Sequence, residues 1–185
     1  CVIRAVGCVA LSWVAAFVWG GDTPAAERAA LEALYTSTNG DSWVDNTGWM
    51  GERGTECAWY GVTCYSNGQV VYLNLRENGL GGQIPAEIGD LERRERLDLS
   101  RNQITGPIPS GIGDLSALKQ LNLVENRLSG AIPDAIGQLG ALEFLDLGSN
   151  ALSGSLNPAL GNLARLVRLD LRSNERSGTI PDSLG

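Results

Sequence analysis

The chain has 185 residues, of which 43% are hydrophobic, so it is long enough and apolar enough to bury a core of domain size. Its formal net charge of −7 excludes the strongly positive field that attracts nucleic acid, and we predict no nucleic-acid partner. It contains no histidine, which removes the commonest general base, a common zinc ligand and every Ser/His or Cys/His nucleophilic pair. We therefore predict that the chain has no catalytic residue, metal or cofactor.

An apolar run occupies residues 5–19, preceded by Arg4 and interrupted only by Ser12 as an obviously polar side chain. A membrane-spanning helix needs about 20 apolar residues, whereas a secretory signal peptide has a shorter apolar core. We therefore predict a signal peptide over residues 1–21. The alternatives are an uncleaved membrane anchor and a buried core segment. Membrane contact is expected only through such an uncleaved segment or through a segment missing from the C-terminus.

One amphipathic helix is expected next, starting at Thr23-Pro24 and ending at the Asn-Gly pair of residues 39–40. Three apolar residues share one face of this helix: Leu31, Leu34 and Tyr35. Further along, three tryptophans lie close in sequence to a pair of cysteines: Trp43, Trp49, Trp59, Cys57 and Cys64. These aromatic residues are predicted to be core.

The rest of the chain repeats at a fixed period of 24 residues (99 minus 75). Leucines mark the period, each preceded two residues earlier by another leucine: Leu75, Leu99, Leu123, Leu147 and Leu171. Three residues after each leucine comes an asparagine: Asn78, Asn102, Asn126, Asn150 and Asn174. Four residues after each asparagine comes a glycine. No helical or coiled-coil rule produces this spacing.

One unit, residues 118–137, reads LKQLNLVENRLSGAIPDAIG, and its neighbours keep the frame LxxLxLxxNxLxGxIPxxIG. Over Val70 to Gly185 this frame resembles the plant-type leucine-rich repeat, as in ectodomains of receptor-like proteins and kinases or secreted polygalacturonase-inhibitor-like proteins. The resemblance implies an α/β repeat solenoid, a superhelix with a concave parallel β-sheet and a small helical, disulfide-bonded N-terminal cap. The expected organisation is a cap over residues 22–66 and five repeats over 67–185, the last truncated.

Elementary geometry explains the slots of the frame. Alternate side chains of a strand face opposite ways, so Leu121 and Leu123 should point into the core while Gln120 and Asn122 face solvent. The recurrent asparagine can bridge backbone groups of adjacent coils. Isoleucine and proline in segments such as residues 106–109 suggest a second, short extended stretch whose proline prevents continued pairing.

The segment from Cys57 to Cys64 leads directly into the first repeat and looks like the N-terminal cap of plant-type repeat proteins. A solenoid needs such a cap because its first coil has an uncovered apolar end. We predict a disulfide between the two cysteines. The alternative for this pair is metal binding or redox chemistry.

Two arginines depart from the frame. Arg94 takes a slot that leucine holds in three later repeats, and Arg176 takes another slot that leucine holds in three repeats. Because burying an unpaired guanidinium is costly, we expect each to reach solvent, to find a carboxylate or to mark a degraded sequence. No Asn-x-Ser/Thr acceptor occurs, so no N-glycan is expected.

A column of acidic and amide residues on successive strands could form a carboxylate pair or a calcium site, but a solvated ladder with family-typical Asp and Asn is the favoured interpretation. The resemblance implies recognition of a peptide, protein or polysaccharide on the concave face, outside the cell or on the outer face of the plasma membrane. The predicted ligand-binding residues are Tyr72, Asn74, Arg76, Arg96, Asp98, Gln120, Asn122, Phe144, Asp146, Arg168, Asp170 and Arg172. Alternatives are the extracellular part of a receptor-like serine/threonine kinase and a structural or ice-binding solenoid, which would need a uniform Thr or Asn column.

Overall fold

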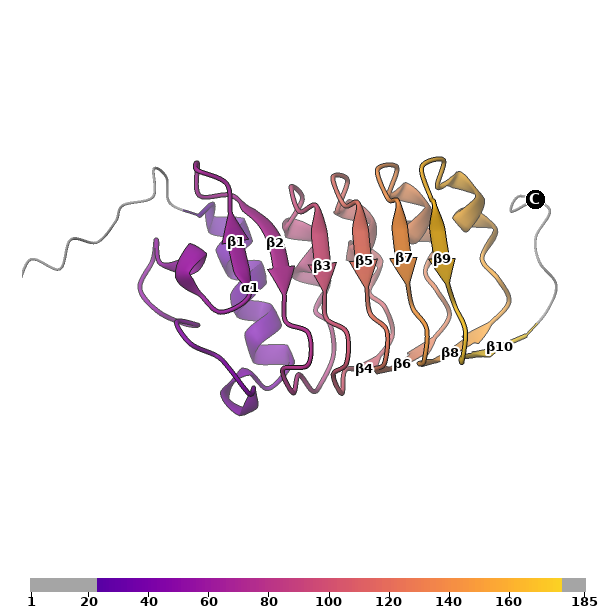
Figure 1. The fold of residues 1–185 in the computed structure, drawn as a ribbon, viewed down its shortest axis with the longest axis horizontal. Helices are drawn as coiled ribbons and strands as arrows, with labels where there is room; N and C mark the ends of the chain where they lie inside the picture. The colour runs from indigo at the N-terminus through magenta and orange to yellow at the C-terminus, as the bar shows by residue number, and fades with distance from the viewer. Residues whose placement is uncertain (1–22, 178–185) are drawn as a thin grey trace, which may run out of the picture.

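The computed structural model describes residues 23–177, in which successive coils stack along one axis with their strands side by side (Figure 1). The predicted signal peptide, residues 1–21, lies outside the described residues. Within residues 23–177, no helix combines the length and apolar character required to cross a membrane.

The first sheet has six strands, one from the cap and one from each of five coils. Its order is β1 (Val62–Cys64), β2 (Val70–Asn74), β3 (Arg96–Asp98), β5 (Gln120–Asn122), β7 (Phe144–Asp146) and β9 (Arg168–Asp170). β1 pairs antiparallel with β2, and the other pairs are parallel. The predicted parallel sheet is confirmed, and it continues into the cap across the proposed boundary at residue 66.

A second sheet runs along the lower edge of the stack in Figure 1. Its order is β10 (Glu175–Arg176), β8 (Ala151–Gly154), β6 (Arg127–Gly130) and β4 (Thr105–Gly106). The predicted second extended stretch therefore exists, but the pairing of β4, β6 and β8 ends at the glycine, before the Ile-Pro segment. Pro107, which directly follows β4, has no N–H to donate, so it explains the end of pairing there. β6 and β8 are followed by Ala131 and Ser155, so proline does not explain where their pairing ends.

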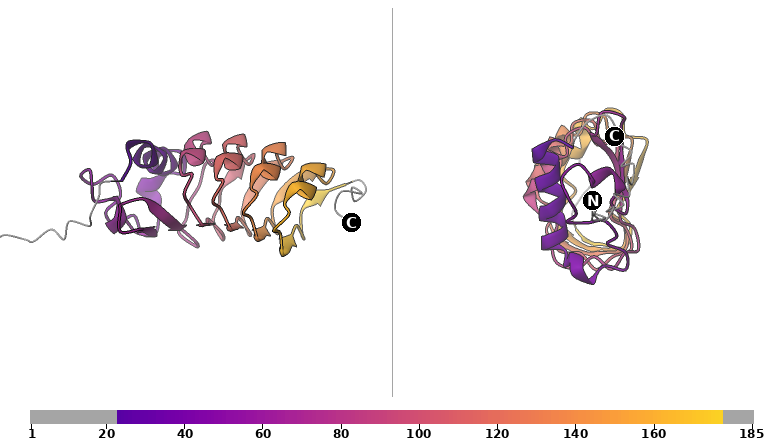
Figure 2. Two further views of the ribbon diagram at one scale, coloured as in Figure 1. Left: turned by 90° about the horizontal axis from the view of Figure 1, so that it is seen from above. Right: turned by 90° about the vertical axis from the view of Figure 1, so that its left-hand side faces the viewer.

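Short 3₁₀ helices complete the coils on the side away from the first sheet. They are η3 (Ala86–Asp90), η4 (Ser110–Asp114), η5 (Asp134–Gln138) and η6 (Pro158–Asn162). Seen end-on, the coils superpose as one cross-section, and helix α1 (Ala25–Ser37) lies on the side of these short helices (Figure 2). The cap helix α1 therefore packs next to η3 and extends the layer of short helices into the cap.

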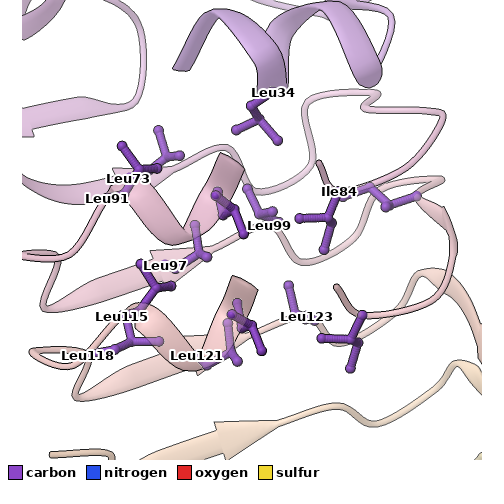
Figure 3. Close-up of a cluster of buried hydrophobic side chains, with 14 of the residues drawn as sticks. Leu34, Leu73, Ile84, Leu91, Leu97, Leu99, Leu115, Leu118, Leu121 and Leu123 are labelled. Carbon is purple, nitrogen blue, oxygen red and sulfur yellow. The ribbon is translucent and has the colours of Figure 1, made fainter. Parts of the chain in front are cut away.

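The core is one cluster of mainly aliphatic side chains that lies between the first sheet and the layer of short helices (Figure 3). Both leucines of the strand frame are buried in successive coils, as Leu97, Leu99, Leu121 and Leu123 show with exposures of 0 to 1%. Burial of one such side chain contributes about 2 kcal/mol before entropy is subtracted. The predicted inward and outward alternation along the strands is confirmed.

The recurrent asparagines bridge adjacent coils as predicted. The Asn102 amide accepts hydrogen bonds from the backbone N–H groups of Asn78 and Leu80 and donates to the carbonyls of Leu75 and Leu99 at 2.9 Å. Equivalent bonds recur at Asn126, Asn150 and Asn174. Asn78 makes its bonds to the cap instead, through the backbone of Asp45. The ladder therefore ties each coil to the one before it.

The residue before each ladder asparagine has a positive φ although it is not glycine. These residues are Glu77, Arg101, Glu125, Ser149 and Ser173, with φ between 52 and 56°. Such values are uncommon outside glycine, so their recurrence once per coil marks a turn that the fold requires. The turn points the asparagine amide into the coil.

In the cap, α1 buries Leu31 and Leu34, as its sequence predicts. The helix starts after Pro24, and Thr23 does not cap it, because the Thr23 hydroxyl donates to the Gly68 carbonyl at 3.1 Å. The helix also buries Glu27, whose carboxylate accepts the Val70 N–H at 2.8 Å. This bond fixes α1 to the first repeat, and burial raises the pKa of Glu27 above its ordinary value.

The predicted tryptophan cluster and disulfide are both present in the cap. Trp43, Trp49 and Trp59 pack in sequence, with ring centroids 4.8 and 5.0 Å apart, and Cys57 is bonded to Cys64. These aromatic rings cover the apolar end of the first coil, which is the role that a solenoid cap has to fill.

Arg94 interrupts the core. Its side chain is 0% exposed, and within residues 23–177 none of its guanidinium nitrogens has a hydrogen-bond partner. Burial lowers its pKa to about 9, opposed by attraction from Glu27. The expectation that it reaches solvent or bonds to a carboxylate is wrong. Arg176 is half-buried and donates one hydrogen bond to the Ser155 carbonyl.

Candidate functional site

The parallel register brings one outward-facing residue of each coil into a single row. Cα partners join each member to the next along the sheet. We call this the exposed row: Tyr72, Arg96, Gln120, Phe144 and Arg168. Arg96 and Arg168 are exposed, Phe144 is 37% exposed, and Tyr72 and Gln120 are half-buried. All five belong to the residues predicted to bind a ligand.

A second row lies two residues further along each strand. We call it the acid–amide row: Asn74, Asp98, Asn122, Asp146 and Asp170. Each side chain accepts a hydrogen bond from the backbone N–H two residues later, at 2.9 to 3.2 Å. These oxygens therefore close the turn after each strand, a structural role that the predicted solvated ladder did not include.

The cation Arg96 is held by an aromatic ring. Its guanidinium carbon lies 5.2 Å from the ring centroid of Tyr72, within the range of a cation–π contact. Among residues 23–177, no carboxylate lies within salt-bridge distance of Arg96 and its guanidinium makes no hydrogen bond. Arg96 is therefore positioned while its donors stay available to a ligand.

At the end of the sheet away from the cap, Asp170 of the acid–amide row binds two arginines. Arg172 donates to both carboxylate oxygens, with its shortest contact at 2.6 Å, while Arg168 lies at 3.6 Å. The hydrogen bonds from Arg172 lower the pKa of Asp170 to about 2. Since Arg172 provides the stronger contacts, most of the hydrogen-bonding capacity of Arg168 remains free, and its side chain is 61% exposed.

A polar cluster lies beside the exposed row, at the residues that directly precede β3 and β5. Glu95 accepts a hydrogen bond from the Tyr65 hydroxyl at 2.8 Å and pairs with Lys119 at 3.2 Å. These two contacts, Tyr65 first, lower the pKa of Glu95. The carboxylate nearest in sequence to Arg96 is therefore occupied by other partners.

The exposed row and all members of the acid–amide row except Asp170 line a groove of about 460 Å³ on the outer face of the first sheet. Of the predicted ligand-binding residues, Arg76, Asp170 and Arg172 lie outside its lining, and Asp170 is buried with 8% exposure. The sequence analysis missed Thr63, which lines the groove from β1. Nothing in the 24-residue period could reveal it, because β1 belongs to the cap and joins the sheet in the opposite direction.

The side chains that line the groove are suited to binding another molecule. It presents guanidinium, amide and aromatic groups, and no group of three or more His, Cys, Asp or Glu side chains able to hold a metal occurs within residues 23–177. An arrangement of exposed arginine and aromatic side chains on a rigid sheet is typical of binding surfaces.

Comparison with known proteins agrees with this architecture. The family described as "Leucine rich repeat" matches residues 95–152 and 116–175, and a second description, "Leucine Rich Repeat", matches residues 69–91. No curated protein sequence matches the chain.

Solved structures are similar over most of the chain. A chain of the BIR3–SERK2 complex from Arabidopsis thaliana is 35% identical, with 84% of this chain and 85% of that chain covered and a TM-score of 0.72. The ectodomain of the Arabidopsis thaliana receptor kinase SOBIR1 is 32% identical, with 89% and 88% covered and a TM-score of 0.73. A plant ice-binding protein is 32% identical, with 88% and 52% covered and a TM-score of 0.78.

The leucine-rich-repeat fold is a recognition module, and the similar plant structures cover 84 and 89% of this chain. The chain therefore belongs to the leucine-rich-repeat family, in its plant type.

Proposed function

We propose that this protein is an extracellular recognition module that binds a peptide or protein segment across the exposed row and catalyses no reaction. The observation that carries the proposal is the register of the first sheet, which places five different side chains from five coils along one groove. Side chains from separate repeats can then contact the same extended partner.

The chemistry of the row supports binding over mere solubility. Arginine and aromatic residues dominate the energy of many interfaces, with losses above about 2 kcal/mol when a central one is truncated. The row contains two of each type within five positions. A row that only kept the sheet soluble would not need the exposed ring of Phe144.

The similar structure of BIR3 and SERK2 is a complex of two plant proteins, which supports a protein segment as the partner here. The similarity to a receptor-kinase ectodomain supports the alternative that this chain is the extracellular part of a receptor-like kinase. In both cases the function of residues 23–177 is the same.

Similarity to a plant ice-binding protein does not lead us to propose that activity. An ice-binding face is expected to repeat one small polar side chain, whereas the exposed row changes between arginine, amide and aromatic residues. A face of this kind matches a partner with varied chemistry.

Selection from a displayed library of random peptides tests the proposal. Peptides enriched on the wild-type protein should lose binding to the double variant Phe144→Ala with Arg168→Ala, by on the order of 100-fold, because two arginine or aromatic contacts of the exposed row are removed. Arg127→Ala is the control, since Arg127 is exposed on β6 of the second sheet. Circular dichroism should be unchanged in all variants. Equal losses in the control would show that the row is not the binding face.

A further inference from the structure

The exposed row separates its two cations by a fixed distance. Arg96 and Arg168 lie on β3 and β9, three strand steps apart in the register. Neighbouring strands are about 4.8 Å apart, so the two positions are separated by roughly 14 Å. No acidic side chain belongs to the row between them, where Gln120 and Phe144 stand.

An extended peptide laid across the strands matches this distance. It rises about 3.3 Å per residue, so its residues i and i+4 are roughly 13 Å apart and point to the same side. Residue i+2 also points to that side and falls between Gln120 and Phe144. The Phe144 ring is available there, because it is 37% exposed.

Both cations are positioned before a ligand arrives. The Tyr72 ring holds Arg96 by a cation–π contact. The Asp170 carboxylate lies 3.6 Å from Arg168, while Arg172 provides most of the positive charge that neutralises Asp170. The two carboxylates that line the groove, Asp98 and Asp146, each accept a backbone hydrogen bond and are half-buried. The most exposed charges of the groove are therefore positive, although the whole chain is acidic.

Building on the recognition function proposed above, we propose that the ligand is an extended peptide segment with acidic residues at positions i and i+4 and an apolar residue at i+2. Its first carboxylate binds Arg96, its second binds Arg168, and its central side chain packs on Phe144. Arginine suits this task because its planar fork donates two parallel hydrogen bonds to one carboxylate.

Two capped heptapeptides of identical composition test the spacing, GESLSEG with its glutamates four apart and GESLESG with them three apart. Binding to immobilised protein, measured by surface plasmon resonance, should favour GESLSEG by about ten-fold over its isomer and over the neutral GQSLSQG. Arg96→Ala and Arg168→Ala should each abolish this preference. Arg127→Ala should keep it, and higher salt should reduce it because the contacts are ionic.

Equal binding of the three peptides, or the same loss with Arg127→Ala, would overturn the acidic-peptide assignment. Binding of an oligogalacturonate probe through both arginines, without binding of GESLSEG, would overturn it in favour of an acidic polysaccharide. If library peptides require the exposed row but carry no spaced acids, the assignment fails while the proposed function stands. If they do not require the row, the proposed function itself fails.

Discussion

The interior of the coils and the exposed row follow opposite rules. The inward positions mostly repeat one residue from coil to coil, as Leu97, Leu121 and Leu145 do, whereas the exposed row changes its residue at each step. Each coil presents the same packing environment to its neighbours, so one side chain fits all of them. The row faces solvent and has no such requirement, which leaves its chemistry free to match a partner.

Substitution of a ladder asparagine should have the largest effect on the repeated interior of the coils. We predict that Asn102→Leu lowers the free energy of unfolding by about 3 kcal/mol or more, because several buried backbone groups lose their partners at once. Urea unfolding followed by circular dichroism measures this change. The control is Gln103→Leu, an exposed neighbour that should change stability by less than about 0.5 kcal/mol. Similar stability of the two variants would show that the ladder is dispensable.

Arg94 breaks the interior rule, since its three counterparts are leucines. We predict that Arg94→Leu raises the free energy of unfolding by about 1 kcal/mol or more, because it removes a buried guanidinium without hydrogen bonds. Thermal and urea unfolding measure the gain. Leu118→Arg, which places the same group in the next coil, should destabilise the protein. A loss of stability in Arg94→Leu would mean that the attraction to Glu27 outweighs the burial cost.

Arg176→Leu should have a smaller effect than Arg94→Leu. Arg176 is half-buried and already donates to the Ser155 carbonyl, so less burial cost is relieved. If burial determines the gain in stability, Arg94→Leu should raise the free energy of unfolding more than Arg176→Leu does, as urea unfolding of both variants would show.

The sequence predicted the features that recur. Period, strand alternation and asparagine ladder all follow from identical residues at identical spacing, and the structure confirms them. It did not predict the positive φ before each asparagine, because Glu77 and Ser149 share that conformation without sharing a side-chain type. The conformation is imposed by the coil and leaves no residue signature.

Features that depend on a single long-range contact were also missed. The buried Glu27 reads as an ordinary polar residue of a helix until its bond to Val70 is known, and Thr63 joins the groove only through the pairing of β1 with β2. Within the candidate site, the five row members were predicted, but the engagement of Asp170 by Arg172 was not. Side-chain pairing of this kind depends on rotamers that a periodic pattern does not specify.

The most direct test of the recognition face is photo-crosslinking from the centre of the exposed row. A benzoylphenylalanine placed at Gln120 should crosslink to a library-selected peptide, because Gln120 lies between Arg96 and Phe144 in the groove. The same photo-reactive residue at Arg127, on the second sheet, should give no crosslink above background. Crosslinking from position 127 but not from position 120 would contradict the account and would place the ligand on the other sheet.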